Sequence, residues 1–78
     1  MSILNELREQ AGLGGPAAVL ANELLVLRQQ YESQELSLEE FQFLVQQVAE
    51  VKAAQELSTD EQALRYIVSA ASAIAMVV

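Results

Sequence analysis

Short breaks divide a chain whose other residues favour helix almost throughout. Leu, Ala, Glu and Gln dominate, proline occurs once, and all three glycines lie between positions 12 and 15. Residues 12–16 are a poor site for helix, because glycine raises the entropy cost of a fixed backbone and proline lacks an amide hydrogen. The sequence therefore predicts an all-α protein with a Gly/Pro hinge at 12–16.

Capping signals place the helices around this hinge. Pro16 suits the first position of a helix. Ser37 and Glu40 have the spacing of a capping box, in which each side chain bonds the other's free amide, and Ser58 and Glu61 repeat that spacing. The expected helices span residues 1–12, 16–33, 37–56 and 59–78.

The expected architecture is a small antiparallel helical bundle formed by one domain, residues 1–78. Short connections favour helical hairpins, so residues 16–78 should supply a three-helix core, with residues 1–12 as a short N-terminal helix beyond the hinge. The buried stripe of the third helix should follow a three-four spacing. Its expected members are Phe41, Leu44, Val48 and Val51.

The side chains that catalysis or metal binding requires are scarce. The chain has no histidine and no cysteine, so a Ser-His-Asp triad, a thiolate site and an ordinary zinc site cannot form. The acidic pairs Glu39–Glu40 and Asp60–Glu61 fall in the first turns of expected helices, where they favour the helix dipole. We expect no enzymatic activity, no cofactor, no metal and no small-molecule substrate.

Charge narrows the choice of partners. The formal net charge is −7, which repels nucleic-acid phosphates and anionic membrane surfaces at long range. We therefore expect no direct nucleic-acid binding. The chain has no cysteine that would point to an oxidising compartment, and charge from Glu6 onward does not fit a signal peptide. These features favour a cytoplasmic location, or one within a larger assembly.

The last helix is uncharged after Arg65. Its apolar residues form two stripes, Leu64, Ile67, Ala71, Ile74 and Val78 on one side and Tyr66, Ala70, Ala73 and Val77 on the other. Because one small core should not cover both, the second stripe is expected to contact a partner. The uncharged run has 13 residues. Since a membrane-spanning helix needs about 20 apolar residues, insertion into a membrane is the less favoured interpretation.

Phe43 is a further candidate contact, because it lies roughly opposite Phe41 on the third helix. Two interpretations stay open, an isolated exposed apolar residue and an aromatic interface anchor. The full set of candidate interface residues is Phe43, Tyr66, Ala70, Ala73, Val77 and Val78.

Residues 22–48 resemble a known family of helical hairpins. A leucine-rich helix, a short polar break and the string Leu36-Ser37-Leu38-Glu39-Glu40-Phe41 are similar to SHOCT domains. The resemblance implies a helical hairpin that mediates oligomerisation. The glycine usual in that family's turn is replaced here by Gln34 or Glu35, and the family is not assigned on this resemblance.

Contact with other proteins is the function that these features favour. The leading hypothesis is a non-enzymatic protein–protein interaction or assembly module that forms a homo-oligomer through its apolar C-terminal helix. A component or assembly factor of a larger particle, such as a virion, would fit it. The alternative is an acidic helical regulator or inhibitor that binds another macromolecule, and the third hypothesis is a membrane-active protein that uses the C-terminal helix.

Overall fold

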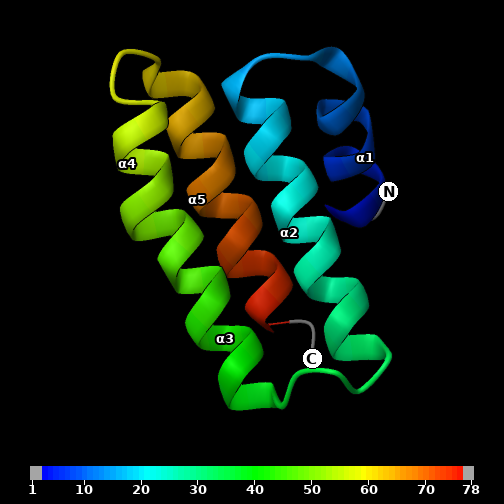
Figure 1. Ribbon diagram of the computed structural model, residues 1–78. Coiled ribbons are helices and arrows are strands. Elements are labelled where there is room, and N and C mark those ends of the chain that lie inside the picture. Colours follow the sequence, from blue (N-terminus) through cyan, green and yellow to red (C-terminus); the bar gives the residue numbers. More distant parts are fainter. Residues whose placement is uncertain (1–2, 77–78) are drawn as a thin grey trace.

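The computed structural model describes residues 3–76, which form helices packed against one another (Figure 1). The helix α3–α4 runs antiparallel to both α2 and α5, so the predicted all-α bundle is confirmed. One long helix consists of α3, a π-helical turn η1 and α4 in direct succession. The elements are α1 (Ile3–Leu13), α2 (Pro16–Glu32), α3 (Leu38–Gln47), η1 (Val48–Lys52), α4 (Ala53–Glu56) and α5 (Glu61–Met76).

The hinge between α1 and α2 consists of two glycines in the left-handed region. Gly14 has φ +84° and Gly15 has φ +91°, values that residues with a Cβ rarely adopt. Gly15 is the N-cap of α2, and Pro16 is its first residue as expected. Helix α1 continues one residue past Gly12, its expected end. The backbone conformation, rather than a lack of space, favours glycine at 14 and 15, because an added Cβ would meet nothing within 4 Å.

Helix α1 packs on the bundle and adds to its core. Leu7 is fully buried in one cluster with Leu20 of α2 and Ala70 of α5. Ile3, Leu4 and Ala11 pack against the same cluster at a three-four spacing. Residues from all the helices therefore share one core, which extends the predicted three-helix core of residues 16–78.

The end of α2 is a Schellman motif built without glycine. Gln34 has φ +66°, while the Glu35 N–H donates to Gln30 O at 2.8 Å and the Gln34 N–H donates to Tyr31 O at 3.1 Å. These two bonds satisfy carbonyls that a helix end otherwise leaves unpaired. Gln34 therefore occupies the left-handed position where helices usually have glycine.

The start of α3 confirms the predicted capping box at Ser37. The Glu40 N–H donates to Ser37 Oγ at 3.2 Å, and the Ser37 N–H donates to Glu40 Oε1 at 3.0 Å. These contacts hold the pKa of Glu40 below its usual value, with the Ser37 backbone contributing most. One turn later, Phe41 is fully buried and its ring stacks on Tyr31 at 4.9 Å between centroids.

The π-helical turn changes which side chains of the third helix are buried. The Ala53 N–H donates to Val48 O, five residues back, so η1 contains one residue more than a regular turn. Phe41, Val45 and Val48 are buried, and Ala53 and Leu57 continue the buried side after the turn. The expectation that Val51 is buried is wrong, because the extra residue rotates it to a position where it is 48% exposed.

Helix α5 begins two residues later than expected, at Glu61. Its cap is Asp60, whose Oδ1 accepts from the Ala63 N–H at 3.1 Å. The predicted capping role of Ser58 is therefore wrong. Asp60 occupies the position three residues before that amide, and its carboxylate also favours the positive end of the helix dipole.

Candidate interaction surface

The C-terminal helix is largely covered within the chain. Ala70 is fully buried together with Ile67, Ala71 and Ile74, while Tyr66 and Ala73 are half-buried. The expectation that Ala70 faces a partner is therefore wrong. Its small side chain lies in the same cluster as Leu7, and α1 contacts α5 there. Val77 and Val78 lie outside the described residues.

Tyr66 shows how closely α1 covers this stripe. Burial raises the pKa of its hydroxyl, and the charges of Glu6 and Glu9 on α1 raise it further. The Tyr66 hydroxyl oxygen is itself buried and has no hydrogen-bond partner within residues 3–76. The sequence did not reveal this arrangement, because it depends on how α1 folds back after the hinge.

A groove with apolar walls opens between α2 and α3–η1. Its volume is about 270 Å³. Its apolar walls are Val26, Leu27, Leu44 and Val48, and its polar walls are Asn22, Glu23, Gln47 and Lys52. We call it the α2–α3 groove. Sequence analysis missed it, although Val26 lies off the Leu20, Leu24, Leu27 stripe of the same helix and so indicated a second apolar side.

An ion pair closes one end of the α2–α3 groove. Lys52 Nζ lies 3.1 Å from Glu23 Oε2 and 3.2 Å from Glu23 Oε1. Because η1 carries Lys52 and α2 carries Glu23, this pair joins the two walls of the groove. It also neutralises the single basic residue between Leu38 and Glu56.

Phe43 lies beside the groove with an acidic surrounding. Its side chain is 59% exposed, and it precedes the groove residue Gln47 by one helical turn. The exposed residues Glu39 and Glu40 lie one turn before it, and the exposed Glu50 lies two turns after it. The structure thus places Phe43 at a surface with apolar and acidic character, apart from Tyr66 and Ala70.

Other exposed apolar residues extend this surface. Val19 and Val26 lie two turns apart on α2, and Val51 follows Gln47 by one turn on the long helix. On α5, exposed Val68 is followed by the exposed polar residues Ser69 and Ser72 before Met76. Exposed apolar residues thus lie on both helices of the α2–α3 groove, while the most exposed ones, Met76 and Leu13, lie at the ends of α5 and α1.

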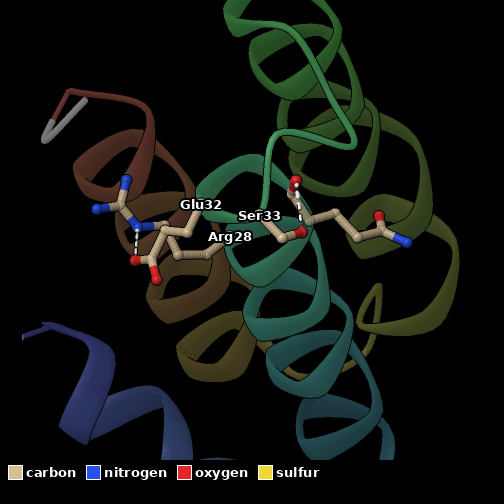
Figure 2. Close-up of polar contacts among 4 residues, drawn as sticks. Arg28, Glu32 and Ser33 are labelled. Carbon is tan, nitrogen blue, oxygen red and sulfur yellow. Dashed lines mark hydrogen bonds and ion pairs between the residues drawn. The ribbon is translucent and has the colours of Figure 1, made fainter.

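The arginines of α1 and α2 line a second, polar cavity of about 490 Å³. Figure 2 shows Arg28 beside Glu32, with Nε donating to Oε1 at 2.8 Å, and on another side of α2 the Ser33 hydroxyl, which donates to Gln30 O at 3.3 Å. Arg8 Nη1 donates to Asn5 Oδ1 at 3.1 Å. Glu32 thus compensates the charge of Arg28, whereas Arg8 is bonded to the neutral Asn5 amide.

Two other kinds of site are absent from the described residues. Between positions 3 and 76, no group of three or more acidic side chains is arranged to hold a metal ion. Within the same range, no helix combines the length and apolar character needed to cross a bilayer.

Comparisons of the chain with protein-family models, with curated proteins and with solved structures find no match. No family match therefore supports the resemblance of residues 22–48 to SHOCT domains. The α2–α3 groove and its surroundings are the features on which a function can be argued.

Proposed function

We propose that this chain is a non-enzymatic protein-interaction module that binds through the α2–α3 groove and Phe43. One observation carries the proposal: a large aromatic side chain, 59% exposed, lies beside an apolar groove while the apolar side of α5 is covered. Aromatic residues are the common anchors of protein interfaces, because they bury much area and lose little side-chain entropy.

The proposal relocates the contact that the sequence predicted. Self-association through α5 loses its main support, since Ala70 lies in the core. A role as a component or assembly factor of a larger particle remains part of the proposal, as does a place inside the cell or within such an assembly. The acidic regulator remains the second candidate, because the surroundings of Phe43 contain three exposed glutamates.

Photo-crosslinking in the producing cell tests the proposal. A benzophenone amino acid replaces Phe43 in one variant and the exposed Val68 of α5 in a matched control. We expect a discrete, light-dependent adduct from position 43 and little or none from position 68. Equal adducts from both positions, or none from position 43, would contradict the proposal.

The mass of the adduct separates the possible partners. An adduct of twice the chain mass identifies a second copy, and any other discrete mass identifies a different protein. Both outcomes support an interaction module, and they distinguish the homo-oligomer from the regulator.

A further inference from the structure

We infer that the occupant of the α2–α3 groove is an amphipathic helix of another protein, with apolar side chains on one face and lysine or arginine beside them. The inference rests on the proposed function and names the chemistry of the partner. The groove has apolar walls and an acidic border, and the occupant must match both.

The shape of the groove favours a helix. Its walls come from the antiparallel helices α2 and α3–η1, which supply the apolar residues Val26, Leu27, Leu44 and Val48. A helix laid into an apolar groove presents side chains at i, i+3, i+4 and i+7, which is a recurring mode of peptide recognition. Phe43 at the border then covers one flank of that helix.

The charges beside the groove favour a basic flank. Glu39, Glu40 and Glu50 are exposed around Phe43, and Lys52 is already paired with Glu23. Lysine or arginine from the occupant would meet these carboxylates and the face of the Phe43 ring, which attracts cations. An acidic flank would meet repulsion at each of these positions.

A second copy of this chain fits the surface less well. A twofold interface uses the same patch on both subunits, so the glutamates around Phe43 would approach their own equivalents. Each copy also carries a net charge of −7, which adds long-range repulsion. The other basic residues offer little compensation, since Arg28 and Arg65 are paired with Glu32 and Glu61, and Arg8 lies on α1, which does not line the groove.

Two synthetic peptides of about 15 residues, long enough to form a helix on binding, test the inference. Both carry leucine at i, i+3, i+4 and i+7, and they differ only in having lysine or glutamate at the flanking positions. The full chain, labelled with ¹⁵N, is titrated with each peptide at low salt. We expect the lysine peptide to shift amides of residues 22–27 and 43–52 and to bind more than about tenfold tighter than the glutamate peptide.

Variants of the full chain locate the binding. Phe43→Ala should weaken the lysine peptide about tenfold, as expected for an interface anchor. The double variant Glu39→Gln with Glu50→Gln should weaken it severalfold. The charge-matched double variant Glu6→Gln with Glu9→Gln should leave it nearly unchanged, because both carboxylates lie on α1, which does not line the groove.

Several outcomes would overturn the inference. Equal binding of both peptides would contradict a basic flank on the occupant. Amide shifts confined to other helices would contradict binding in the α2–α3 groove. If neither peptide binds but position 43 crosslinks to a second copy, the inferred identity of the occupant is wrong, while the proposed function stands. If position 43 gives no adduct at all, the proposed function fails as well.

Discussion

Lys52 of η1 and Glu23 of α2 are joined by an ion pair of 3.1 Å across one end of the α2–α3 groove. Both side chains retain solvent exposure, so the pair should position the helices more than it stabilises them. Lys52→Gln should therefore lower the free energy of unfolding by less than about 1 kcal/mol, measured by urea denaturation. A loss several times larger would show that the pair is needed to hold η1 against α2.

The π-helical turn predicts that one deletion is tolerated. Removing the exposed Val51 would turn η1 into a regular helical turn, because the Ala53 N–H would then be four residues from Val48 O. Phe41, Val48 and Leu57 would keep their buried positions. The variant should unfold cooperatively in circular dichroism with near-wild-type helix content.

A deletion in a regular helix is the control for this prediction. Helix α2 contains no extra residue that could compensate a deletion. Removing the exposed Gln29 should therefore rotate Tyr31 away from Phe41 and abolish cooperative unfolding. Equal tolerance of the two deletions would mean that the π-helical turn does not set the register.

Gln34 offers a stabilising substitution. Its φ of +66° is costly for a residue with a Cβ and easy for glycine. Gln34→Gly should raise the free energy of unfolding by about 0.5 to 1 kcal/mol, after the larger entropy of glycine in the unfolded chain is subtracted. Gln34→Ala serves as the control and should give no gain. Destabilisation by glycine in urea denaturation would contradict the left-handed conformation of residue 34.

The pH dependence of stability should reveal the capping box. The pKa of Glu40 is lowered from 4.5 in the folded chain, chiefly by hydrogen bonding to the Ser37 backbone. A carboxyl with a lowered folded pKa stabilises the protein above its unfolded pKa, and this contribution disappears as the pH falls through the folded pKa. The melting temperature is measured from pH 6 downward. Below about pH 4.5 it should drop less steeply in Glu40→Gln than in the unchanged chain. Parallel curves would contradict the assignment.

Local signals in the sequence predicted most of the helix ends. Gly15 with Pro16 and the Ser37–Glu40 box act through bonds within a few residues, so their patterns are readable without the fold. The roles of Val51 and Ala70 were predicted wrongly because they depend on packing. Val51 is rotated outward by η1, and Ala70 shares the core with Leu7 of α1, whose position follows from the hinge rather than from helical periodicity.

The candidate surface was predicted only in part. Phe43 was identified because it lies opposite the Phe41 stripe, which helical spacing alone shows. The groove beside it needs α2 and α3 to be aligned so that Val26 faces Leu44, and that alignment is a tertiary feature. The Lys52–Glu23 pair joins residues far apart in the chain and gave no sequence signal.

We propose that Phe43 serves binding rather than folding. Its neighbour Phe41 is fully buried, so Phe41→Ala should cost about 3 to 5 kcal/mol, whereas Phe43→Ala should change the free energy of unfolding by less than about 1 kcal/mol. A benzophenone amino acid at Gln47, which lines the groove, provides the readout of binding in the producing cell. The most direct measurement is the yield of its adduct with Phe43 intact and with Phe43→Ala. We expect the adduct to be largely lost in Phe43→Ala while the free energy of unfolding changes by less than about 1 kcal/mol. An undiminished adduct from the folded Phe43→Ala chain would contradict this proposal.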